Sequence, residues 1–154
     1  MEALGATASV IAVATLAWQS TKATYEIIDG LVEAPTVIAD SRRRLSDTQD
    51  VLVLLQTQLR PHTESPDSSH LLDSLLQEVK LERSLELTRR LCDDFQVTLK
   101  GYTKHSSDSQ ISNRDRFSVH FHESTIRRFN TELSNCHSGL TTVLASINVS
   151  VDLR

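Results

Sequence analysis

The stretch Ala3–Thr21, with the sequence ALGATASVIAVATLAWQST, contains no charged residue, whereas charged residues recur throughout the rest of the chain. It is rich in alanine, and its large apolar side chains lie on all sides of a helical wheel: Val10, Ile11, Val13, Leu16 and Trp18. A helix that is apolar on every side is buried either in a protein core or in lipid. Fold and function therefore both depend on which of these environments the helix occupies.

The length of this stretch is close to the roughly 20 residues that span a bilayer. Polar side chains interrupt it, among them Thr7, Thr15 and Gln19, so it is a poor spanning helix. It is also a poor secretory signal, because Glu2 precedes it where such a signal carries Lys or Arg. Two compatible interpretations stay open: a core helix in the resting fold, and a helix that leaves the core and enters a membrane.

The composition predicts one helical domain. A chain of 154 residues is enough for a single core, and it contains only four Gly and three Pro. The formal net charge of -4 argues against a nucleic-acid partner. The two cysteines, Cys92 and Cys136, lie on apolar helical stripes, which favours buried thiols over a disulfide scaffold. We expect residues 1–150 to form the domain and 151–154 to be a tail or the start of a linker.

Apolar periodicity predicts four long helices. The first runs from about residue 3 to 32 and carries a stripe at three- and four-residue spacing: Trp18, Thr21, Tyr25, Ile28 and Val32. The second begins at or just after Pro35, a residue suited to a first helical turn. It carries a packing seam that repeats every seven residues, made of Ile38, Leu45, Leu52 and Leu59.

The third predicted helix begins near residue 68 and continues to Tyr102, with an offset in its apolar stripe near residues 80–83 that indicates a bend or a break. The fourth begins between residues 113 and 118 and continues to about Ile147. No segment is predicted to pair as a strand. The expected fold is therefore all-α, a bundle of four long helices, or of five if the third is broken.

We find no pattern that predicts catalysis or metal binding. The chain has no Gly-rich phosphate loop and no His-Glu-x-x-His motif. His120 and His122 are two residues apart, so on a helix they point in diverging directions and cannot share a metal ion. We expect a protein that is not an enzyme and that has no catalytic residue, metal or cofactor.

The only dense basic cluster is Arg42-Arg43-Arg44, which Asp40 and Asp47 flank. Such a cluster is typical of a solvated helix face. Contact with anionic lipid or with a partner protein is the alternative.

The order of these motifs resembles a known family. Met1-Glu2-Ala3-Leu4 leads into Ala8-Ser9-Val10-Ile11-Ala12-Val13, and Trp18 and Tyr25 follow. The second helix continues from Arg42–Leu45 into Asp50-Val51-Leu52-Val53-Leu54-Leu55. This arrangement is similar to the fungal N-terminal domain of STAND or NLR-like (NACHT-NTPase) proteins. That domain is called HeLo-like, and also the azaphilone cluster protein L N-terminal domain.

The resemblance implies an N-terminal effector or signalling domain of a fungal immune receptor, followed by a nucleotide-binding or repeat domain. Related domains induce programmed cell death by assembling with copies of themselves and releasing an apolar first helix into the membrane. The corresponding membrane-active residues here are Leu4, Val10, Ile11, Val13, Leu16 and Trp18. The alternative is a soluble adaptor that assembles with like domains and has no membrane activity. We expect a cytoplasmic protein that moves to the plasma membrane on activation.

Overall fold

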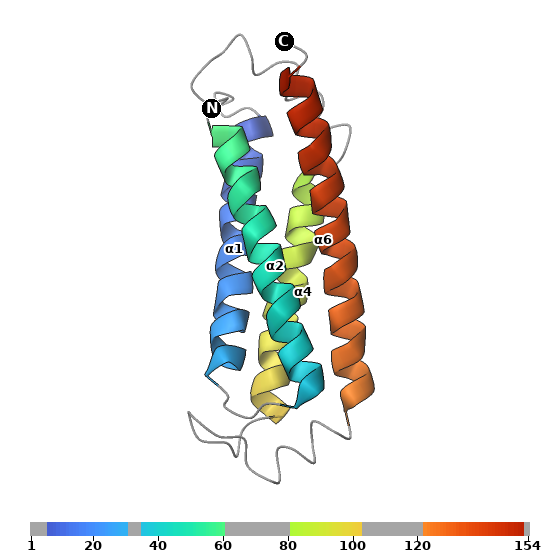
Figure 1. Ribbon diagram of the computed structural model, residues 1–154. Coiled ribbons are helices and arrows are strands. Elements are labelled where there is room, and N and C mark those ends of the chain that lie inside the picture. The colour runs from blue at the N-terminus through green and yellow to red at the C-terminus, as the bar shows by residue number, and fades with distance from the viewer. Residues whose placement is uncertain (1–5, 31–34, 61–80, 103–121, 153–154) are drawn as a thin grey trace.

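The computed structural model describes residues 6–30, 35–60, 81–102 and 122–152 (Figure 1). These residues form four long helices and no strand: α1 (Ala6–Asp29), α2 (Thr36–Leu59), α4 (Leu81–Tyr102) and α6 (Glu123–Asp152). The predicted all-α bundle of four long helices is thus confirmed for the described part of the chain. Of the predicted bend or break near residues 80–83, residues 81–83 form the first turn of α4, while residue 80 and the preceding part of the predicted third helix lie outside the described residues.

Each helix packs against two others. α1 contacts α2 and α4, and α6 also contacts α2 and α4, so α1 and α6 lie diagonally across the bundle. α1 and α4 run in one direction, while α2 and α6 run in the opposite direction (Figure 1). The pairs α1–α4 and α2–α6 are therefore parallel neighbours that are far apart in the sequence.

The second helix begins where the sequence predicts. Pro35 precedes it in an extended conformation, with φ -54° and ψ 152°, and its carbonyl oxygen accepts hydrogen bonds from the backbone N–H groups of Ile38 and Ala39. The four seam residues of α2 are completely buried: Ile38, Leu45, Leu52 and Leu59. The sequence pattern of α2 therefore describes both its start and its buried face.

Three other predicted helix ends differ from the structure. α1 ends at Asp29 rather than near Val32, and the residue that follows is Gly30, an amino acid that commonly ends helices. α6 begins at Glu123, later than predicted. It also continues to Asp152, through residues predicted as a tail, because Asn148–Val151 contain neither Gly nor Pro.

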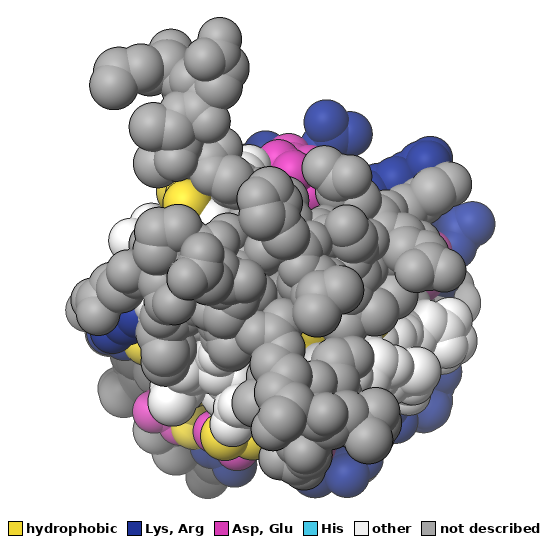
Figure 2. All heavy atoms as spheres, turned by 90° about the horizontal axis from the view of Figure 1, so that it is seen from above, with side chains coloured by type: hydrophobic (Ala, Val, Ile, Leu, Met, Phe, Trp, Pro, Cys, Tyr) yellow, Lys and Arg dark blue, Asp and Glu magenta, His cyan; other side chains and the backbone are white. Residues whose placement is uncertain are grey.

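The core consists of two hydrophobic clusters, one toward each end of the bundle. On α1, α2 and α4, the buried residues between the two clusters carry hydroxyl groups: Thr21, Thr24, Thr48 and Thr88. The middle of the core is therefore more polar than its two ends. Seen end-on, the described part of the bundle has charged side chains of both signs around its perimeter, and its hydrophobic side chains show only as small patches (Figure 2).

Candidate functional site: the first helix and its contact with α4

The buried face of α1 is made mainly of small residues. Its fully or almost fully buried residues follow three- and four-residue spacing: Val10, Ala14, Ala17, Thr21, Thr24 and Ile28. Small side chains let the α1 backbone approach α2 and α4 closely, but each buries little apolar area. Val10 and Ile28 are the only large apolar side chains of α1 that are almost completely buried.

The large apolar side chains of α1 lie mostly beside this face rather than on it. Leu16 is 48% exposed, and Ile11, Val13 and Trp18 are partly buried against the cluster toward the N-terminal end of α1. The structure thus divides the predicted membrane-active set. Val10 is in the core, four members flank it or face solvent, and Leu4 lies outside the described residues.

The predicted apolar stripe of the first helix needs a correction. Thr21 and Ile28 are buried as expected, but Trp18 and Tyr25 are only partly buried. The buried stripe passes through Ala14 and Ala17 instead, because the close contact with neighbouring helices favours small side chains. The sequence does contain a stripe of Ala and Thr at helical spacing, and this stripe could have been used to predict the buried face.

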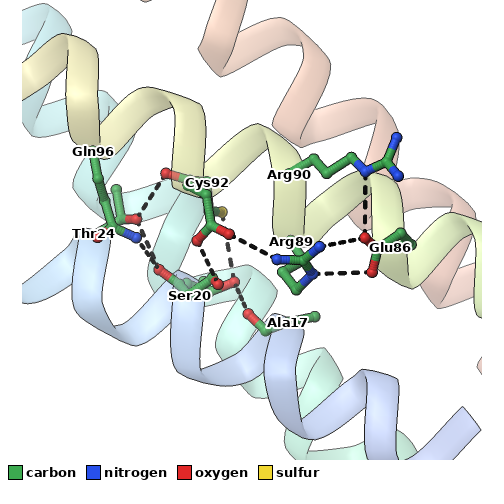
Figure 3. A network of polar contacts seen from close by, with 10 residues as sticks. Ala17, Ser20, Thr24, Glu86, Arg89, Arg90, Cys92 and Gln96 are labelled. Carbon is green, nitrogen blue, oxygen red and sulfur yellow. Dashed lines mark hydrogen bonds and ion pairs between the residues drawn. The ribbon is translucent and has the colours of Figure 1, made fainter.

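Polar groups connect α1 to α4 (Figure 3). Ser20 Oγ donates a hydrogen bond to Asp93 Oδ1 at 2.7 Å, and Gln96 Nε2 donates to the Ser20 carbonyl oxygen at 3.3 Å. Thr24 Oγ1 lies 3.3 Å from the carbonyl oxygen of Cys92 and 2.8 Å from that of Ser20, so its single proton is shared between these two acceptors. We call these five residues the α1–α4 contact. The hydrogen bonds of this contact join residues that are 68 to 76 positions apart in the sequence.

Arg89 supports this contact from within α4. Its guanidinium pairs with Asp93 at 3.0 Å and with Glu86, which also pairs with Arg90 (Figure 3). Hydrogen bonding to Arg89 lowers the pKa of Glu86 from its ordinary value. The carboxylate that accepts the Ser20 hydroxyl is therefore held in place by a neighbouring arginine on its own helix.

The threonine hydroxyls of α1 also have acceptors within their own helix. Thr15, Thr21 and Thr24 donate to the carbonyl oxygens four residues before them, at 2.9, 2.7 and 2.8 Å. Threonines that bond in this way satisfy their hydroxyl groups without another helix. They would keep these hydrogen bonds if α1 left the bundle.

Cys92 lies directly opposite α1. Its Sγ is 3.7 Å from Thr21 Oγ1, and burial raises the pKa of the thiol to about 12. A thiol with this pKa stays protonated at neutral pH and reacts slowly. Cys136 is also a free thiol, but it is only partly buried, so the expectation of two buried cysteines holds for Cys92 alone.

The three arginines of the basic cluster pair with acidic residues of the same chain. Arg42 reaches Asp29 of α1 at 3.3 Å, while Arg43 and Arg44 pair with Asp40 at 2.9 and 3.0 Å. Arg44 also donates a hydrogen bond to Ser134 of α6. The hydrogen bond from Arg43, with a further contribution from Arg44, lowers the pKa of Asp40. Contact of this cluster with anionic lipid stays a prediction.

None of the four helices in the described ranges has the length and apolar character needed to cross a membrane.

Residues 1–152 match the family model described as pigment biosynthesis cluster protein PigL N-terminal. The chain belongs to the PigL N-terminal family. This family is the azaphilone cluster protein L family of the resemblance, so that part of the sequence-based expectation is confirmed. No curated protein and no solved structure matches the chain. The matched residues include all four described helices.

Proposed function

We propose that this PigL N-terminal domain is a membrane-acting effector domain of a fungal NLR-like receptor and that α1 is its output element. In the resting state α1 completes the bundle. On activation it leaves α2 and α4, binds the membrane and induces cell death. The observation that carries the proposal is the unusual packing of α1, which buries small residues and leaves large apolar side chains such as Leu16 and Trp18 at its edges.

The energetics of burial support α1 as the mobile helix. Seven large apolar side chains are buried on α2: Val37, Ile38, Leu45, Val51, Leu52, Leu55 and Leu59. Burial of one such side chain contributes about 1.5–3 kcal/mol, so the two on α1 contribute about 3–6 kcal/mol and the seven on α2 about 10–20 kcal/mol. Partly buried apolar side chains add to the contribution of α1 and narrow this difference: Ile11, Val13, Trp18, Tyr25 and Ile27. Separation of α1 also leaves the α2–α6 and α4–α6 interfaces in place.

The hydrogen bonding within α1 is compatible with a position in the lipid bilayer. A polar group in lipid has no water to bond with, so it needs a partner within the protein. Thr15, Thr21 and Thr24 already have such partners in the helix itself. The proposal does not require α1 to cross the bilayer, because a helix with large apolar side chains can lie in the headgroup region.

A soluble adaptor is the second candidate, and the α1–α4 contact favours it. Ser20, Thr24 and Gln96 make specific hydrogen bonds between the two helices, which suits an α1 that stays in the bundle. In this case the domain signals by assembling with like domains through its outer surface. The two candidates differ in whether α1 must move.

A disulfide between α1 and α4 tests the proposal. Thr21→Cys, in a Cys136→Ser background, places a thiol opposite Cys92, because the present Oγ1–Sγ distance is 3.7 Å. We expect the oxidised protein to cause no dye leakage from phosphatidylserine-containing vesicles, and the reduced protein to cause leakage. The fluorescence of Trp18, the only tryptophan in the chain, should shift to shorter wavelength only when the reduced protein binds.

The control variant replaces Cys92 with Ser as well, so that it carries the same change on α1 but cannot form the bond. Its leakage should not depend on oxidation. Equal leakage by the locked and reduced proteins would refute release of α1. No leakage by any folded variant would favour the soluble adaptor.

A further inference from the structure

Release of α1 would uncover a groove between α2 and α4, with α6 behind it. This groove contains apolar side chains that now share a hydrophobic cluster with Val10, Ala14 and Ala17 of α1, among them Leu52, Leu55 and Leu85. It also contains the Asp93 carboxylate and the Cys92 carbonyl oxygen, which accept hydrogen bonds from Ser20 and Thr24. An uncovered apolar groove of this kind favours association with another surface.

The chemistry of the groove selects its occupant. A helix that fits must present small residues where Ala14 and Ala17 lie, because both are fully buried. It must also donate hydroxyl hydrogen bonds at the positions of Ser20 and Thr24. α1 of a second copy meets all of these requirements. We propose that the domain assembles by helix exchange, in which α1 of one copy occupies the α2–α4 groove of another. This inference rests on the proposed release of α1.

The arrangement of the chain suits exchange. The α1 backbone packs closely against α2 and α4, and its side chains share one hydrophobic cluster with α2, α4 and α6, so exchange into the same groove of another copy reproduces these contacts. Only residues 30–34 separate α1 from Pro35, and the two flanking helices run in opposite directions. Short connections of this kind between exchangeable elements promote domain swapping. Reciprocal exchange gives a closed dimer, whereas one-way exchange gives an open chain of copies.

Disulfide formation between two different variants detects the exchange directly. One variant carries a single thiol on α1, from Thr21→Cys with Cys92→Ser and Cys136→Ser. The other carries only Cys92, on α4, through Cys136→Ser. The two are mixed, incubated near the midpoint of thermal unfolding so that α1 can exchange, cooled and treated with a mild oxidant. We expect a disulfide-linked heterodimer that increases with total protein concentration.

A matched control moves the thiol to the outer face of α1. Gln19 is exposed, so the Gln19→Cys counterpart should not bond to Cys92, which is buried. Equal cross-linking by both thiols would overturn the proposal, because it would show random collision.

A second possible result is a linkage between two α1 thiols, in place of the heterodimer. It would overturn exchange by showing that released first helices pair with one another. The same oxidation is applied to the Thr21→Cys, Cys136→Ser protein, in which the α1–α4 disulfide forms within one chain. Absence of cross-linked heterodimer where that disulfide forms and blocks vesicle leakage would refute exchange and leave the proposed membrane function intact.

Discussion

The small buried face of α1 predicts a specific response to a larger side chain. Ala17 is fully buried between α1 and the neighbouring helices, so the larger side chain of Ala17→Leu cannot extend into solvent and must fit into the core. Such overpacking lowers the free energy of unfolding by about 1–3 kcal/mol. For a chain of this size the melting temperature should fall by about 2–12 °C, at 2–4 °C for each kcal/mol.

The response should be local to α1. Because α6 packs against both α2 and α4, we expect the fluorescence of Trp18 to shift to longer wavelength at temperatures where circular dichroism still shows the helices of the bundle. The measurement is a thermal melt followed by both signals. In the wild-type protein the two transitions should lie closer together.

Ala12→Leu is the matched control, since Ala12 lies on the exposed side of the same helix. Its stability should stay within about 0.5 kcal/mol of wild type. If Ala17→Leu and Ala12→Leu had the same effect, the assignment of the small face to the groove would be wrong. A single coincident transition in Ala17→Leu would contradict the local release of α1.

Three further predictions concern other parts of the bundle. Gly139 is exposed within α6 and a Cβ there would meet nothing within 4 Å, so Gly139→Ala should raise the unfolding free energy by about 0.5–1 kcal/mol in urea titration. The Cys92 pKa is raised from 9.0 to about 12, so folding favours the neutral thiol. The free energy of unfolding should therefore fall as the pH rises from 9 toward 12. Thermal melts over this pH range should show a smaller fall for Cys92→Ala than for the wild-type protein. The pKa of Asp40 is lowered, mainly by its hydrogen bond from Arg43, so its carboxylate contributes stability that is lost as the pH falls below 3.8. In an acid titration, Asp40→Asn should lose less unfolding free energy than the wild-type protein.

The sequence predicted α2 well and α1 only in part, for a physical reason. In α2 the apolar residues repeat on one side, so periodicity identifies the buried face, and Pro35 marks the start. In α1 the apolar residues lie on every side, so periodicity cannot choose among them. The size of the side chains decides which side of α1 is buried, since Ala14 and Ala17 allow close contact between helices and Leu16 does not.

The α1–α4 contact could not be predicted from the sequence. Ser20 and Asp93 are 73 positions apart, and nothing in the local pattern of either helix shows that they meet. The ion pair between Asp93 and Arg89 is different, because those residues are four positions apart on one helix, a spacing that brings side chains together. What the sequence lacked was the neighbour order of the helices, which depends on tertiary packing.

The same neighbour order has a consequence for folding speed. Ser41 and Asn130, whose side chains meet between α2 and α6, are separated by 89 positions. Before such residues meet, a long segment of chain must close into a loop, and the loss of conformational entropy slows folding. We therefore expect the α2–α6 pair to form more slowly during folding than the α1–α2 pair, which only residues 30–34 connect.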